Sequence, residues 1–142
     1  SEGGMGAIKA MSAALRDAQL TTNDISYINA HGTSTPFNDK TESAAIESLF
    51  GEQSSDLRVS STKSMIGHAL GASGALEAVV CVKSIVDGIA PPTINYEHPD
   101  PECALNYIPN KSEKFAINAT MSNSFGFGGH NAVIVFKKWD ED

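Results

Sequence analysis

The chain has 142 residues, with ten basic and seventeen acidic side chains and a formal net charge of -7. This excess of acidic side chains argues against broad electrostatic binding to nucleic acid or to an anionic membrane surface, so neither is expected as a partner. Hydrophobic residues make up 41% of the chain and charged residues 19%, which is the balance of a folded protein and not of a disordered one.

The ends of the chain and its cysteines give expectations about processing and compartment. The opening at 1–4 is not a natural initiation, so we expect a cut or processed chain, and no signal-peptide pattern opens it. The longest apolar stretch, 69–90, contains three charged residues and reads as a buried helix, not as a membrane span. Cys81 and Cys103 form no metal-spacing pattern, which indicates a reduced intracellular protein.

The first elements in chain order are a helix and a strand that leads into a polar loop. Apolar residues at three- and four-residue intervals predict an amphipathic helix over 4–19. A short strand over 25–30 delivers the polar segment 31–36 at its C-terminal end, where open α/β sheets gather their ligands. Asn38 is expected to cap a second helix that ends at Gly51.

The same arrangement is repeated further along the chain. A strand over 57–60 opens into the polar segment 61–68, and the helix of the apolar stretch follows. Apolar residues crowd the faces of that helix and small residues permit close backbone approach, so we expect it to be buried on most sides. Prolines end it, and the segment 93–109 is expected to lie over the surface. Two late strands, 114–122 and 131–138, are expected to form a hairpin.

Three loops carry residues suited to catalysis. Two of them place a histidine beside a glycine after a strand, at His31 and His68, and the third, 123–129, offers flexible backbone N–H groups. Together they would form a pocket that donates hydrogen bonds to a developing negative oxygen. Taken singly, a histidine after a strand is as often structural as catalytic, and a glycine-rich run also serves ordinary turns.

The three segments match, in order and spacing, motifs of a known family. Over nearly its whole length the chain resembles the C-terminal part of 3-oxoacyl-[acyl-carrier-protein] synthases, which are thiolase-like condensing enzymes. The matching motifs are Asn-Ala-His-Gly-Thr-Ser-Thr at 29–35, Asp39-Lys40 with Glu42, Ser-Ser-Thr-Lys-Ser-Met-Ile-Gly-His at 60–68, Gly-Ala-Ser-Gly-Ala at 71–75, Pro-Pro-Thr-Ile-Asn at 91–95 and Asn-Ser-Phe-Gly-Phe-Gly-Gly at 123–129. The resemblance implies an α/β fold, the C-terminal half of a thiolase-like fold, with a mixed sheet packed with helices.

The resemblance implies decarboxylative Claisen condensation, in which malonyl carrier loses carbon dioxide and the resulting carbanion attacks an acyl-enzyme thioester. His31 and His68 would donate hydrogen bonds to the malonyl thioester oxygen, each worth about 3 kcal/mol of barrier. Lys63 would lie behind His68, with Glu42 as its acidic partner, although an ordinary salt bridge would read the same in sequence. Phe127 resembles the gating position, and its backbone N–H would supply half of the acyl oxyanion hole.

Further residues have substrate-binding places in the resemblance. Thr33 and Thr35 would hydrogen-bond the pantetheine arm, whereas hydroxyls at these positions also satisfy turns. Phe125, Gly126 and Gly128 belong to the loop whose movement would admit the substrate.

The resemblance also implies partners and cofactors. Asp39 would support the site beside Glu42. Phosphopantetheine would arrive on the acyl carrier protein, as acyl-ACP and malonyl-ACP, so the chain needs no cofactor of its own and no catalytic metal. Glu77 falls where some members bind a structural monovalent cation. The family usually forms homodimers, and we expect a bacterial cytoplasmic location, with plastids and mitochondria as the other options.

The nucleophilic cysteine of the family lies in the N-terminal half of the full enzyme. Cys81 reads as helix core and Cys103 lies in the proline-rich segment, so neither takes its place. Without a thiolate no acyl-enzyme forms. We therefore expect residues 1–142 to be an incomplete beta-ketoacyl synthase C-terminal domain, inactive without its N-terminal half. His130 stands where many members have threonine, and the resemblance assigns it no role.

Three alternatives stay beside a fatty-acid elongating synthase. A non-catalytic partner subunit would shape a pocket for another chain's cysteine, but has less need of both histidines. A polyketide synthase ketosynthase fragment would share the motifs, although the ending at 138–142 resembles a chain terminus and favours a discrete synthase. A metal-dependent hydrolase using His31, His68 and Asp39 would bind stoichiometric zinc.

Overall fold

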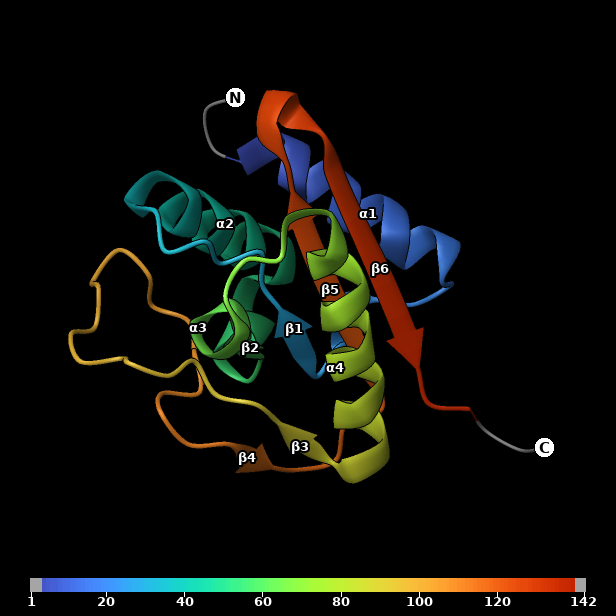
Figure 1. Cartoon of the computed structure of the whole chain (residues 1–142). Coiled ribbons are helices and arrows are strands. Elements are labelled where there is room, and N and C mark those ends of the chain that lie inside the picture. Colours follow the sequence, from blue (N-terminus) through green and yellow to red (C-terminus); the bar gives the residue numbers. More distant parts are fainter. Residues whose placement is uncertain (1–3, 140–142) are drawn as a thin grey trace.

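A four-stranded sheet lies at the centre of the computed structural model, which describes residues 4–139 (Figure 1). In the order β2-β1-β5-β6, its strands are Arg58–Ser60, Tyr27–Asn29, Ala119–Phe125 and Asn131–Lys137. Strand β1 runs parallel to both β2 and β5, whereas β6 runs antiparallel to β5. This mixed sheet with helices on it confirms the predicted fold class.

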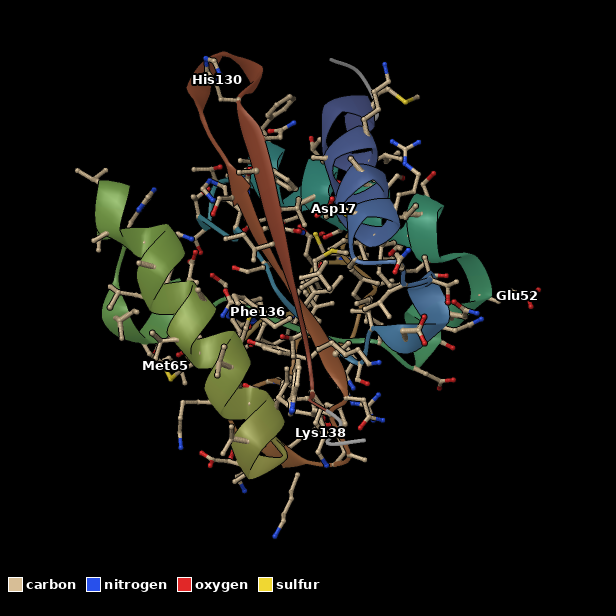
Figure 2. All side chains as sticks on the ribbon, turned by 90° about the vertical axis from the view of Figure 1, so that its right-hand side faces the viewer. Asp17, Glu52, Met65, His130, Phe136 and Lys138 are labelled. Atoms are coloured by element: carbon tan, nitrogen blue, oxygen red, sulfur yellow. The ribbon has the colours of Figure 1, made fainter. Side chains whose placement is uncertain are left out.

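Helices cover both faces of the sheet. The α-helices are α1 Met5–Asp17, α2 Pro36–Phe50, α3 Lys63–Ile66 and α4 Ser73–Asp87. Figure 2 shows the layers edge on, with α4 on one side of the sheet and α1 and α2 on the other. Short 3-10 turns are η2 Thr22–Asp24, η3 Gly51–Ser55, η4 Leu70–Ala72 and η5 Phe127–Gly129, and a separate antiparallel pair is made by β3 Ile89–Ala90 and β4 Glu113–Lys114.

The core is divided by the sheet into two clusters. Successive residues of a strand point to opposite faces. On β1, Ile28 therefore packs with α1 and α2 in the larger cluster, and Tyr27 packs with Cys81 of α4 in the smaller one. All three residues of β1 are buried, which is what a central parallel strand requires. Among residues 4–139, no helix is long and apolar enough to cross a bilayer.

Several predicted boundaries move by a few residues. Helix α2 begins at Pro36, because a proline at the first helical position has a fixed φ and needs no N–H partner. Asn38 does not cap it; its side-chain amide donates to the Asp39 carboxylate at 3.4 Å. The helix ends at Gly51 as predicted, with a left-handed φ of 58°.

The late strands are also redistributed. The segment predicted as one strand over 114–122 is two strands, since β4 pairs with β3 and β5 begins only at Ala119. Strand β5 continues to Phe125, so part of the predicted glycine-rich connection belongs to the strand. The hairpin of β5 and β6 is confirmed. The predicted features at 1–3 and 140–142 lie outside the described residues.

Helix α4 is buried on one side only, and the prediction that it is buried on most sides is wrong. The side facing the sheet carries Ser73, Glu77, Cys81 and Ser84. The outward side carries large apolar residues that no described element covers: Leu76, Val79, Val82 and Val86. We call these four residues the outer α4 face. Val79 is 62% exposed and Val86 is 70% exposed, so this side contributes little to the stability of the chain as it stands.

We predict that Val79→Ser and Val86→Ser each change the free energy of unfolding by less than about 0.5 kcal/mol, as substitutions at exposed positions do. As the matched comparison, Ile28→Ala removes a fully buried side chain and is expected to cost about 2–5 kcal/mol. Urea unfolding of the three variants measures both effects. Equal losses at Val79 and Ile28 would show that the outer α4 face is covered in solution.

Candidate active site

The loop after β1 is held by one buried carboxylate. Glu42 on α2 accepts hydrogen bonds from the backbone N–H groups of His31, at 2.9 Å, and Gly32, at 3.0 Å. The Asn123 side chain of β5 donates to the same carboxylate at 3.2 Å. Burial raises the pKa of Glu42, and these three donors oppose that shift. One side chain thus joins α2, β5 and the loop that carries His31.

Gly32 fits this loop because it has no side chain. Its φ is 43°, in the left-handed region, and a Cβ there would stand 2.4 Å from the Cβ of Ser61. The Ser61 hydroxyl donates to the carbonyl oxygen of Gly32 at 2.8 Å. The loops that follow β1 and β2 are therefore in direct contact at a position where only glycine fits.

Asp39 lies one helical turn before Glu42 on α2 and acts on the same loop. Hydrogen bonds from the Ser34 backbone and the Asn38 side chain lower its pKa, but burial is the larger effect and the pKa is raised overall. Two acidic side chains of α2 therefore accept donors from the segment between His31 and Ser34. The supporting roles predicted for Asp39 and Glu42 in the reaction stay a prediction.

The two predicted histidines come together at the ends of β1 and β2. The rings of His31 and His68 are edge to face, with centroids 5.9 Å apart. The ring of Phe125, at the end of β5, lies 6.1 Å from that of His31. Three segments that are far apart in sequence thus converge at one edge of the sheet, as the spacing of the loops predicts.

The hydrogen bonds of His68 fix the position of its proton. Its Nδ1 accepts the backbone N–H of Leu70 at 3.1 Å and lies 3.0 Å from the Ser73 hydroxyl. A backbone N–H can only donate, so Nδ1 carries no hydrogen and the ring proton is on Nε2. His68 therefore has one N–H group left for a ligand.

His31 is a neutral ring at physiological pH. Burial lowers its pKa to about 4, and the nearby charges of Lys63 and His68 act in the same direction. The expectation that neutral histidines can serve as donors is consistent with this environment.

Lys63 pairs with Glu77 of α4, and the predicted pairing with Glu42 is wrong. The side chains of Lys63 and Glu77 form a salt bridge and are only 6% and 1% exposed. The reason lies in the layers: Glu42 is on the α2 side of the sheet, where backbone N–H groups occupy it, while Lys63 faces α4. Removing one partner of such a buried pair strongly destabilises the folded protein, because an uncompensated buried charge is left behind.

The remaining predicted residues surround this centre. The hydroxyls of Thr33 and Thr35 lie 3.3 Å apart near the start of α2. Gly126 follows β5, and Gly128 has a left-handed φ of 74° within η5. Phe127 begins η5; the predicted gating role of its side chain lies outside what the structure describes.

A cavity of about 530 Å³ opens between α2, α3 and the segment 93–107, and His68 lines it. Of the predicted site residues, its lining contains Thr33, Asp39, Glu42, Lys63 and His68. In the described part of the chain, His31, Thr35, Phe125 and the glycine-rich loop lie outside that lining.

Sequence reasoning missed the wall of this cavity. The segment 93–109 does run over the surface, yet it is tied to the site: the Thr93 hydroxyl accepts the Ser61 N–H at 3.2 Å, and the Ile94 N–H donates to the Ser64 hydroxyl at 3.0 Å. Tyr107 adds a hydrogen bond to Ser43 of α2. The only available signal was the Pro-Pro-Thr-Ile-Asn motif at 91–95.

The arrangement also bears on the alternatives. No three His, Cys, Asp or Glu side chains between residues 4 and 139 are grouped to hold a metal ion. Cys81 is buried on the side of α4 that faces the sheet, and burial raises the pKa of its thiol to about 12. A thiol in that state is not a nucleophile at neutral pH.

Known proteins resemble this chain over most of its length. Proteins named 3-oxoacyl-[acyl-carrier-protein] synthase 2 from Synechocystis sp. and Staphylococcus aureus are both 53% identical to it, over 136 and 137 residues. Each match covers 96% of this chain and 33% of the relative. The chain therefore spans about a third of the length of the curated relatives that it matches.

Solved structures give the same result for the fold. A type II polyketide ketosynthase, bound to a hexaketide and in complex with its acyl-carrier protein, is 42% identical with a TM-score of 0.94, over 97% of this chain and 34% of that one. A beta-ketoacyl synthase from Burkholderia phymatum is 42% identical with a TM-score of 0.87, over 94% of this chain and 32% of that one.

Residues 1–97 match the family model described as beta-ketoacyl synthase, C-terminal domain. Because this match covers more than half of the chain, the chain belongs to the beta-ketoacyl synthase family and corresponds to its C-terminal domain.

Proposed function

We propose that this chain is the C-terminal part of a fatty-acid elongating 3-oxoacyl-ACP synthase, an acyltransferase, and that it supplies two histidine donors for decarboxylative condensation. The observation that carries the proposal is the meeting of the His31 and His68 rings at 5.9 Å. The relatives at 53% identity bear the name of such synthases. Polyketide ketosynthases at 42% identity make a polyketide enzyme the second candidate.

The chemistry follows from the two N–H groups. When malonyl thioester loses carbon dioxide, the electron pair of the broken carbon–carbon bond moves onto the thioester oxygen as an enolate. His68 offers its Nε2–H, and neutral His31 offers a second donor. With N···O distances of about 2.9 Å, two rings whose centroids lie 5.9 Å apart can both donate to one oxygen atom. Such donors stabilise charge where it develops in the transition state. The enolate carbon then attacks the acyl thioester and expels the cysteine thiolate.

Two carboxylates keep the histidines ready for this task. Glu42 fixes the backbone of His31, so that the loop carrying the ring is held in place before substrate arrives. Glu77 holds Lys63 in place, and the positive charge of Lys63 contributes to keeping His31 neutral. In this proposal Lys63, Glu42 and Glu77 are positioning residues.

The proposal includes partners that lie beyond this chain. The nucleophilic cysteine would come from an N-terminal half, since Cys81 is buried and Cys103 lies in the wall segment. The uncovered outer α4 face supports such a partner, because large exposed apolar patches mark interaction surfaces. Acyl-ACP and malonyl-ACP would deliver the substrates, and the intact enzyme would be a cytoplasmic homodimer.

The substrate arm would be held by the loop after β1. The hydroxyls of Thr33 and Thr35 point to one another at 3.3 Å and remain partly open to solvent. The hydroxyl that accepts in this pair keeps its own hydrogen, which would be donated to an amide carbonyl of pantetheine. Phe125, Gly126 and Gly128 would border the entrance, and the backbone N–H of Phe127 would face the acyl carbonyl.

We also propose a structural monovalent cation beneath α4. The Oε2 atom of Glu77 and the Oδ1 atom of Asn29 are buried, and neither has a hydrogen-bond partner among the described residues. Buried acceptors without donors are costly, and a cation satisfies them. Bound there, the cation would complement Lys63 in neutralising Glu77.

The first test concerns the two donors. In this chain complemented by an N-terminal half that bears the cysteine, we expect His31→Ala and His68→Ala each to lower malonyl-ACP decarboxylation by about 10²–10³-fold. Glu52→Ala, at an exposed position outside the lining of the cavity, is the control and should retain the rate. Full activity of both variants would refute the roles of these histidines and favour a non-catalytic subunit.

The second test uses pH. The pKa of His31 falls from 6.5 to about 4 on folding, so the unfolded chain binds more protons between these values. The stability that neutral His31 contributes is present above pH 6.5 and is lost as the pH falls towards 4. We expect His31→Gln to flatten this part of the curve of unfolding free energy against pH. Identical curves for wild type and His31→Gln would contradict a buried neutral His31.

The third test addresses the cation. We expect the melting temperature of this chain to be higher in potassium chloride than in tetramethylammonium chloride of equal ionic strength, because an ion that binds only the folded state stabilises it. Equal melting temperatures at all salt concentrations would argue against the site.

A further inference from the structure

His130 closes the glycine-rich loop between β5 and β6. Figure 2 shows it at the far end of this hairpin. Phe125 pairs with Asn131 in the register of the two strands, so the loop comprises residues 126–130. Within it, the Gly126 N–H donates to the carbonyl oxygen of His130 at 2.7 Å. The main chain of His130 therefore fixes the residue that immediately precedes Phe127.

The ring of His130 acts on the residue that follows Phe127. A Cβ placed on Gly128 would stand 3.6 Å from Cδ2 and 3.9 Å from Nε2 of His130, so the imidazole borders the space that a side chain at Gly128 would occupy. Gly128 has a left-handed φ of 74° and Gly129 one of 81°. Without a side chain across them, two consecutive glycines of this kind leave the loop many conformations.

We propose that His130 is a positioning residue for the backbone N–H of Phe127. Its carbonyl holds Gly126 and its ring holds Gly128, so the peptide between these contacts has one preferred orientation. This inference rests on the proposed function, in which that N–H faces the acyl carbonyl. It separates the two half-reactions: His130 serves acyl transfer, whereas His31 and His68 serve decarboxylation.

The contact made by the ring is one of shape and not of hydrogen bonding. Among the described residues no hydrogen bond to the imidazole of His130 is formed, and the residue is exposed. A phenylalanine would keep a planar ring over Gly128, whereas an alanine would remove it. The pair His130→Ala and His130→Phe therefore tests the ring without relying on a change of charge.

The first arm of the experiment measures the loop itself in this chain. We expect hydrogen exchange of the amides of residues 126–129 to become about three- to tenfold faster in His130→Ala. In His130→Phe it should remain close to wild type, and His98→Ala serves as the remote control. Unchanged exchange in His130→Ala would overturn the proposal.

The second arm measures the two half-reactions of the chain complemented with its N-terminal half. We expect His130→Ala to slow acyl transfer to the cysteine about tenfold, because a misplaced donor loses most of its effect. Malonyl decarboxylation should fall less than twofold, and His130→Phe should restore acyl transfer. Equal losses in both half-reactions would mean a merely structural residue and would overturn the proposal. Faster loop exchange together with an inactive wild type would leave the positioning intact and reject the proposed function instead.

Discussion

The structure depends on a carboxylate buried among backbone donors. A charged group without partners is unfavourable inside a protein, and Glu42 is tolerated because two main-chain N–H groups and the amide of Asn123 surround it. The same contacts fix the loop that carries His31, so a requirement of folding and a requirement of the site are met by one side chain. The absence of a Cβ at Gly32 then lets the loop after β2 approach and bring His68 into reach.

Acidic side chains act from both sides of the sheet on the pair of histidines. Glu42 and Asp39 reach the first loop from α2, while Glu77 reaches Lys63 from α4. Burial is the main cause of the lowered pKa of His31, and the charge of Lys63, held nearby and compensated by Glu77, adds to it. The position of the site residues therefore depends on polar contacts from the helices on both faces of the sheet as much as on the strands that end there.

Much of this arrangement was predictable from the sequence, and the exceptions have physical causes. Short strands followed by polar loops predicted that His31 and His68 lie at one edge of the sheet, because ligand-binding residues of open α/β sheets gather beyond the C-terminal ends of the strands. The partner of Lys63 was not predictable: Glu42 and Glu77 are equally acidic, and only the layering of helices decides which one faces it. Helix α2 begins at Pro36 and is not capped by Asn38, because a proline at the first helical position needs no N–H partner. Tyr107 and Thr93 were missed because irregular segments carry no periodicity that reports what they cover.

The side of α4 that faces water has its own consequence. Four large apolar residues lie on it, whereas its serines, its glutamate and its cysteine face the interior. Apolar association is driven largely by entropy near room temperature and weakens on cooling. Chains that meet through this stripe would adhere more firmly when warm than when cold. Low temperature would thus keep copies of the protein apart. Association through salt bridges would not be weakened by cooling in this way.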